Sequence, residues 1–273
     1  MNAHGRLLVG FAARLFGGTR SALQEVEFGG EHGFGAIQFR GHVHEEKRTE
    51  FGNLATLAIG LEDHGLVPTM ELLIGLDSDG RTDDGRSPVE VLGENLQIIT
   101  TLGIRFVHWH LYPLHPENLT SVDRLNEFLP EQCLQAISLA HVHQFAFGIE
   151  NNDPDMNLLS EPGQCGALLD RVPDLNLVWD FNHSRPEHGE GFQQLASRIS
   201  VLHVSDSPLP KVNYHLPLGQ GTIDVAAHVQ AVVAGGFGGP AVLEIGGLPK
   251  SGGYGRDTDM ALIASKVRLE TMV

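Results

Sequence analysis

The stretch LNLVWDFNH, residues 175–183, carries the pattern on which the fold assignment depends. Its apolar part has about the length of a β-strand that is buried on both faces. The run ends on Asp180, and His183 follows three residues later. A carboxylate is rarely buried unless it is paired or bound to a metal. The stretch therefore predicts a buried strand with a functional carboxylate at its carboxyl end.

Seven further apolar runs have a similar length: LLVGFA (7–12), GAIQF (35–39), VPTMELLI (67–74), IRFVHWH (104–110), FAFGIE (145–150), ISVLHVS (199–205) and AVLEI (241–245). Amphipathic helical segments separate the runs, and several of them end at a Gly just before the next run. Eight strand–helix units in 273 residues predict an α/β protein with one domain, a (β/α)8 TIM barrel over residues 1–273. A doubly wound open sheet is the alternative, but no GxGxxG motif follows the first run.

The polar segment DSDGRTDDGRSP, residues 77–88, follows the third run. In a barrel, the loops that follow the strands surround the active site. We interpret the segment as a mobile lid loop over that site. A disordered insertion without a function is the alternative.

The chain is acidic, with 18 basic and 34 acidic residues and a net charge of -16. Such a surface repels phosphate backbones, so we expect no nucleic-acid partner. No apolar run approaches the ~18 residues that span a bilayer, so we expect no membrane partner either. The first run lacks a convincing cleavage site after it, which favours a cytoplasmic protein. Barrels of this type often pair, so a homodimer is an open alternative to a monomer.

Polar residues lie at or near the carboxyl ends of the last four runs, in the order Glu150, Asp180, His203 and Glu244. In a barrel these strand ends converge on one mouth. Carboxylates so placed repel each other and raise each other's pKa, unless a cation supplies the compensating charge. Three carboxylates and one imidazole suit Mn²⁺, Mg²⁺, Co²⁺, Fe²⁺ or Zn²⁺. The pattern predicts one divalent metal ion, with manganese or magnesium favoured.

Five motifs in the second half of the chain carry a family resemblance: FGIENN (147–152), LVWDFNH (177–183), VLHVSD (201–206), HLPLGQGTID (215–224) and AVLEI (241–245). With them the sequence resembles the xylose isomerase-like TIM-barrel superfamily, which includes sugar phosphate isomerases, epimerases and endonuclease IV. The resemblance implies that one divalent metal is held by the strand-end residues Glu150, Asp180, His203 and Glu244. It also implies that His183 lies over the substrate.

The activity that the resemblance implies is isomerisation or epimerisation of a small sugar, sugar acid or cyclitol. The metal would stabilise an enediolate while Glu150 and Glu244 remove and return a proton, with His183 as a third catalytic residue. A dehydratase or lyase with the same site, or a catalytically silent sugar- or metal-binding barrel, is the alternative. A nuclease is disfavoured, because Asn213 and Thr69 stand where endonuclease IV-like members are expected to have metal ligands.

Further residues are expected around the carbohydrate substrate. We expect His110, His183, His215 and Lys211 to bind it. Of the two histidines in the fourth run, we expect only His110, the one nearer the mouth, to point inward. Asp206 is expected either to orient His203 from behind or to cap the loop that follows it.

Overall fold

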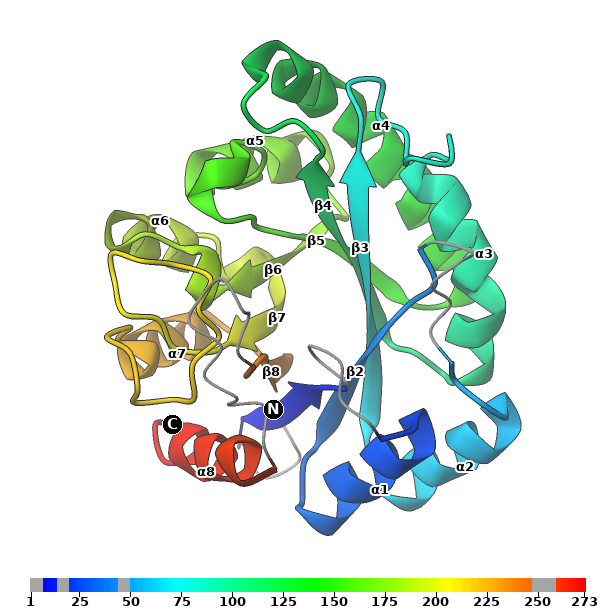
Figure 1. The fold of residues 1–273 in the computed structure, drawn as a ribbon, viewed down its shortest axis with the longest axis vertical. Helices are drawn as coiled ribbons and strands as arrows, with labels where there is room; N and C mark the ends of the chain where they lie inside the picture. The colour runs from blue at the N-terminus through cyan, green and yellow to red at the C-terminus, as the bar shows by residue number, and fades with distance from the viewer. Residues whose placement is uncertain (1–6, 14–19, 44–49, 247–258) are drawn as a thin grey trace.

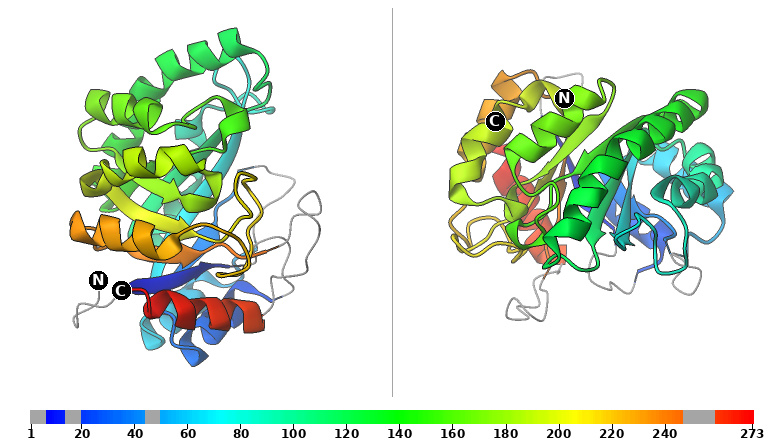
Figure 2. Two further views of the ribbon diagram at one scale, coloured as in Figure 1. Left: turned by 90° about the vertical axis from the view of Figure 1, so that its left-hand side faces the viewer. Right: turned by 90° about the horizontal axis from the view of Figure 1, so that it is seen from above.

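The computed structural model describes residues 7–13, 20–43, 50–246 and 259–273. Its eight strands are all parallel and close into a barrel in sequence order, and helices surround them (Figure 1). The views in Figure 2 show the helices from α4 (green) to α8 (red) following one another around the outside of the strands. The single (β/α)8 barrel predicted from the apolar runs is confirmed.

The strands coincide closely with the eight apolar runs. They are β1 (Leu8–Ala12), β2 (Ala36–Arg40), β3 (Val67–Leu76), β4 (Phe106–Pro113), β5 (Ala146–Glu150), β6 (Asn176–Asp180), β7 (Ile199–Val204) and β8 (Pro240–Leu243). The largest differences among the carboxyl ends are at three strands: β3 and β4 extend two and three residues beyond the predicted ends, and β8 stops two residues before its predicted end.

The α-helices alternate with the strands along the chain. They are α1 (Ala22–Glu31), α2 (Leu54–Asp63), α3 (Pro88–Thr101), α4 (Leu119–His143), α5 (Pro162–Arg171), α6 (Gly189–Gln193), α7 (Val225–Ala234) and α8 (Asp259–Glu270). Short 3₁₀ turns are η2 (Pro154–Met156), η3 (Phe181–His183), η4 (Pro186–His188) and η5 (Ala196–Arg198). In the described part of the chain, no helix is long and apolar enough to cross a membrane.

The segment 77–88 follows β3 and leads into α3, whose first residue is Pro88. A capping box ends it, because the Ser87 side chain accepts from the Glu90 N–H and the Glu90 carboxylate accepts from the Ser87 N–H. Arg86 pairs with Asp84 within the segment and donates to the carbonyl oxygen of Val43. The second contact connects the segment to the loop after β2. None of these residues lines the cavity described below. Their role as a lid stays a prediction.

The inside of the barrel is layered. Valines stand two residues before three of the strand-end polar residues, at Val178, Val201 and Val242, and they cluster with Ala12 and Phe106. Side chains two residues apart share one face of a strand, so these apolar residues lie directly beneath the polar ones. A larger apolar core that includes residues of both strands and helices completes the fold. The barrel floor therefore excludes water beneath the strand ends.

In β5 the same position is Gly148, two residues before Glu150. A Cβ at Gly148 would come within 2.6 Å of the Phe106 ring and 3.0 Å of the Asn176 carbonyl oxygen. Glycine is thus required here by the close approach of the neighbouring strands.

Candidate metal centre

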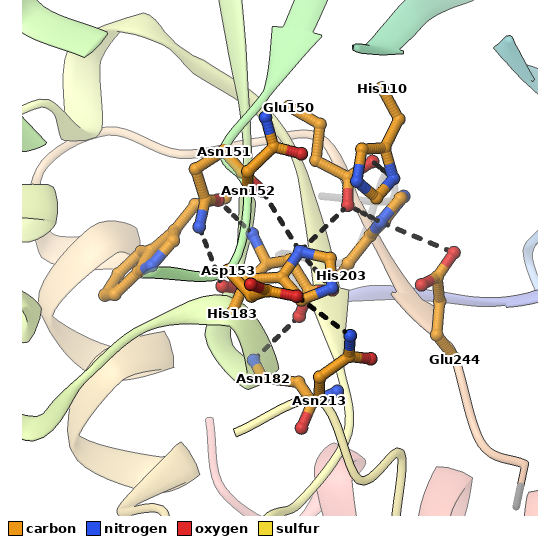
Figure 3. Close-up of polar contacts among 12 residues, drawn as sticks. His110, Glu150, Asn151, Asn152, Asp153, Asn182, His183, His203, Asn213 and Glu244 are labelled. Carbon is orange, nitrogen blue, oxygen red and sulfur yellow. Dashed lines mark hydrogen bonds and ion pairs between the residues drawn. The ribbon is translucent and has the colours of Figure 1, made fainter. Parts of the chain in front are cut away.

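The four predicted ligand residues converge at the carboxyl ends of β5 to β8. Glu150 and Asp180 end their strands, His203 is one residue from the end of β7, and Glu244 directly follows β8. One ligand atom from each lies within 4.8 Å of all the others. Figure 3 shows the side chains of Glu150, His203 and Glu244 pointing toward one another. The structure brings the four residues together, and their role as ligands stays a prediction.

The donor atoms of this cluster fit a divalent cation. Both carboxylate oxygens of Glu150, Oδ2 of Asp180 and Nδ1 of His203 are buried and have no hydrogen-bond partner. Buried polar atoms are normally satisfied, so each such atom in a native structure requires an explanation. Oxygen and imidazole donors without a thiolate suit the hard and borderline divalent ions named above. A bound cation would supply the missing interactions.

The two carboxylate oxygens of Asp180, at the end of β6, have different roles. Its Oδ1 accepts from the Asn182 N–H at 2.7 Å and so caps the 3₁₀ turn η3. Its Oδ2 is left for the cluster, 3.2 Å from Nδ1 of His183. The same Nδ1 lies 3.0 Å from the Asn151 carbonyl oxygen. The DFNH sequence thus fixes a carboxylate and an imidazole beside each other.

Charge in the cluster shifts the carboxyl pKa values in opposite directions. Burial alone would raise the pKa of Glu150, but His110, His203 and His108 outweigh it and hold that pKa well below the ordinary value. Burial, together with nearby carboxylates, raises the pKa of Glu244 to about 8. Glu150 is therefore ionised and Glu244 holds a proton near neutral pH when no cation is bound.

The histidines respond to the same carboxylates. Burial opposes charge on His203, but Glu244 and Glu150 outweigh it and raise its pKa to about 10. Burial likewise opposes charge on His110, whose pKa Glu150 and Glu71 raise to about 9. His215 behaves differently, because burial lowers its pKa to about 3.

Both histidines of β4 face the interior, which corrects the expectation that only His110 does. Nε2 of His108 and Nδ1 of His110 lie 3.3 and 3.4 Å from Oε2 of Glu150. The expectation was wrong because residues two apart in a strand share a face, while Trp109 between them points to the outer core. His108 is fully buried, and His110 lines the cavity described below.

A cavity of about 360 Å³ opens above the cluster. Its walls combine polar and apolar side chains: Arg40, Glu71, Leu73, His110, Tyr112, Asn152, Asp153, Met156, His183, Asn213, His215 and Glu244. Three of the four residues predicted to bind substrate, His110, His183 and His215, are among them. Glu150 is not part of the lining and lies behind it.

Lys211 is the fourth predicted substrate-binding residue, and the structure does not place it in the cavity. Its side chain is exposed, with Nζ 6.0 Å from the centre of the Tyr214 ring. The Asn213 N–H donates to the Asn182 carbonyl oxygen, which turns this loop so that Asn213 and His215 line the cavity instead. Arg40 and His110, whose pKa is raised to about 9, both line the cavity and supply positive charge there.

Asp206 caps the loop after β7, the second of its two expected roles. Its carboxylate accepts from the N–H groups of Ser207, Gly219 and Ile223 at 2.9, 2.8 and 3.1 Å. The side chain that contacts His203 from behind is Gln38, with Oε1 2.8 Å from Nε2 of His203. The expectation that Asp206 orients His203 is corrected accordingly.

Two charged residues of the site, Arg40 on β2 and Glu71 on β3, were not predicted from the sequence. Arg40 pairs with Glu71 through Nε and Oε2 at 3.2 Å, and Oε1 of Glu71 lies 3.4 Å from Nδ1 of His110. Burial alone would raise the pKa of Glu71, but Arg40 and His110 outweigh it and hold that pKa below its ordinary value. A single charged residue within an apolar run, as in VPTMELLI, is the signal that points to Glu71.

Hydrogen bonds among polar side chains hold the cavity wall around His215 in place. The His215 ring lies 2.9 Å from the Glu244 carbonyl oxygen and 3.0 Å from Oδ1 of Asn213. Nδ2 of Asn213 donates to Oδ2 of Asp153 at 3.1 Å, as the dashed lines of Figure 3 show. These contacts hold hydrogen-bonding groups in place along one side of the cavity.

The sequence model of the xylose isomerase-like TIM barrel matches residues 26–262, and the chain belongs to this family. No curated protein matches the sequence. Among solved structures, D-psicose 3-epimerase from Clostridium cellulolyticum H10 is similar with a TM-score of 0.74 and 12% identity, over 97% of this chain and 99% of that chain. The 3-keto-D-glucoside 4-epimerase from E. coli gives 0.75 and 13%, over 97% and 100%. The IolI protein with a bound zinc atom gives 0.69 and 19%, over 97% of each chain. At these identities the likeness shows the fold.

Proposed function

We propose that this protein is a divalent-metal-dependent isomerase or epimerase of a small sugar, sugar acid or cyclitol. The observation that carries the proposal is the cluster of four ligand atoms within 4.8 Å of one another, beside a polar cavity of about 360 Å³. Two of the similar structures are sugar epimerases and a third holds zinc, which supports the assignment.

Glu150, Asp180, His203 and Glu244 would hold one ion, with manganese or magnesium favoured. When bound, such an ion supplies a Lewis acid for adjacent substrate oxygens. The cluster sits where apolar side chains exclude water from below, so charge on its residues acts strongly on a bound substrate.

Proton transfer is assigned to Glu244 and Glu150. Glu244 lines the cavity directly and is only 5% exposed, so it meets the substrate without competing bulk water. Glu150 lies behind the lining with both oxygens unpaired by hydrogen bonds. A substrate must therefore bind against the cluster, rather than in the wider cavity, to reach both carboxylates.

His183 and the opposite wall would orient the substrate hydroxyl groups. The Asn151 carbonyl oxygen holds Nδ1 of His183, which leaves the far edge of the ring, with Nε2, for another partner. Asn213 and the Arg40–Glu71 pair add donors and acceptors around the cavity. Polyhydroxylated molecules match a wall of this kind, because each hydroxyl group both donates and accepts.

Proton exchange with solvent tests the proposal. The metal-loaded protein is incubated in D₂O with ketoses, aldoses, sugar acids and cyclitols, and products are read by NMR and mass spectrometry. We expect one deuterium at the carbon that changes configuration or oxidation state, and no exchange with Glu244→Gln. Loss of water from the product would indicate the dehydratase or lyase instead. Absence of exchange and of any product across the panel would favour the silent binding barrel.

A further inference from the structure

A buried amide links two of the proposed metal ligands. Gln38 lies on β2 and is 1% exposed. Its Nε2 donates to Oε1 of Glu244 at 3.0 Å, and its Oε1 lies 2.8 Å from Nε2 of His203. One side chain thus contacts ligands that come from β7 and β8.

The polarity of these two contacts follows from the chemistry of the groups. The NH₂ group of Gln38 faces Oε1 of Glu244. With a cation bound, Glu244 would be ionised and could only accept, so the NH₂ group would have to keep this direction. The carbonyl oxygen of Gln38 then faces His203, and that ring must donate from Nε2. Once a cation displaces the extra proton of the ring, the nitrogen left without a hydrogen is Nδ1, which lies 3.3 and 3.4 Å from Oε1 of Glu150 and Oε1 of Glu244. The amide thereby selects which ring nitrogen faces the other ligands.

The sequence also provides the space for this contact. In the barrel β1 stands between β2 and β8, and its residue Ala12 is in register with Gln38. Because the alanine side chain is a single methyl group, the Gln38 side chain can extend past β1 to β8 and β7. Ala12 itself belongs to the apolar cluster of the floor.

We propose that Gln38 is a positioning residue that orients His203 and Glu244 for metal binding and keeps the imidazole in the form that binds through Nδ1. This inference rests on the proposed metal-dependent function. Residues that hold metal ligands by hydrogen bonds typically change metal affinity about 10- to 100-fold when they are replaced. Gln38 holds two ligands, and its loss should have an effect of that size.

The first test compares the Mn²⁺ affinity of wild type, Gln38→Leu and Thr69→Val by electron paramagnetic resonance. Thr69 is the matched control, because it pairs with Gln38 across β2 and β3, is 1% exposed, and has a hydroxyl group without a hydrogen-bond partner. We expect Gln38→Leu to bind Mn²⁺ about 10- to 100-fold more weakly and Thr69→Val to match wild type. Wild-type affinity in a folded Gln38→Leu would overturn the inference while leaving the proposed function intact.

The second test reads the imidazole directly and remains valid if Gln38→Leu does not fold. Nitrogen-15 NMR of the zinc-loaded protein, with His203 assigned from a His203→Asn sample, should show the proton of wild-type His203 on Nε2. Gln38→Glu keeps an acceptor for that proton and should retain slow exchange of it. A proton on Nδ1 of wild-type His203 would overturn the inference. A wild-type protein that binds neither Mn²⁺ nor Zn²⁺ would overturn the proposed function, and this inference with it.

Discussion

Asp180 shows how one residue can serve both the local fold and the site. One carboxylate oxygen caps the turn after β6, and the other is buried without a hydrogen bond in the cluster. The sequence predicted the four strand-end ligand candidates because each interrupts an apolar run at its carboxyl end. It did not reveal Gln38 or Arg40, because their partners are far along the chain and meet them only when the barrel closes.

The Arg40–Glu71 pair allows a prediction at this scale. In metal-free protein, Arg40→Met leaves the buried Glu71 carboxylate without its guanidinium, and should lower the free energy of unfolding by about 1–3 kcal/mol at neutral pH. The matched control is Arg81→Met, whose partner Glu90 is exposed, and its cost should be clearly smaller because solvent screens the pair. Urea unfolding measures both, and equal costs would contradict the prediction.

The difference in unfolding free energy between wild type and Arg40→Met should decrease in acid. The pKa of Glu71 is lowered in the folded protein, so the pair stabilises the fold at neutral pH and its contribution is lost as the pH falls. We expect the gap between wild type and Arg40→Met to shrink below the ordinary glutamate value of 4.5. A gap that widens in acid would show that Arg40 acts through another group.

At the scale of elements, the apolar pattern of the sequence was sufficient to predict the strands and insufficient to predict the course of the loops. Buried parallel strands are read from short apolar runs, and Gly before a run marks the end of a helix. The loop 207–223 carries no such pattern. Its course depends on hydrogen bonds from backbone N–H groups to Asp206 and on the contact of Asn213 with Asn182, so Lys211 was misplaced.

Asp206→Ala tests what holds this loop. Three backbone N–H groups lose a charged acceptor, and we expect a loss of about 1.5–3 kcal/mol in unfolding free energy. Asp224→Ala is the control, because Asp224 accepts from the single N–H of Ala227 at the start of α7 and should cost about 1 kcal/mol. Hydrogen exchange at Gly219 and Ile223 should accelerate in Asp206→Ala. Unchanged exchange there would rule out the capping role.

At the scale of the whole molecule, closure of the barrel creates the site. Strands that are distant in sequence bring four carboxylates, Glu71, Glu150, Asp180 and Glu244, into one mouth above an apolar floor. The sequence predicted the convergence of Glu150, Asp180 and Glu244 through the fold, because the carboxyl ends of barrel strands meet at one end. It did not predict Glu71. The cavity walls and the amide bridge depend on side-chain positions that the apolar pattern does not encode.

Because the carboxylates crowd together at the mouth of the barrel, metal affinity should increase with pH. With no ion bound, Glu244 and His203 have pKa values of about 8 and about 10, so both carry a proton near neutral pH. A cation must displace both protons, and its affinity should rise about tenfold per pH unit for each proton released, as the pH goes from about 6 to about 8. Isothermal titration in buffers of different ionisation enthalpy measures the proton release. An affinity independent of pH would contradict the proposed ligand set.

The most direct test of the central claim is metal content by elemental mass spectrometry, on reconstituted wild type and on Asp180→Asn. The asparagine oxygen can still cap η3, so the variant removes the charge while keeping the turn. Asp224→Asn, at a helix cap away from the cavity, serves as control. We predict close to one equivalent of metal per chain in wild type and control, and a sharp loss in Asp180→Asn with unchanged circular dichroism. No metal in reconstituted wild type would contradict the metal-dependent mechanism, and two or three equivalents would contradict a mononuclear site.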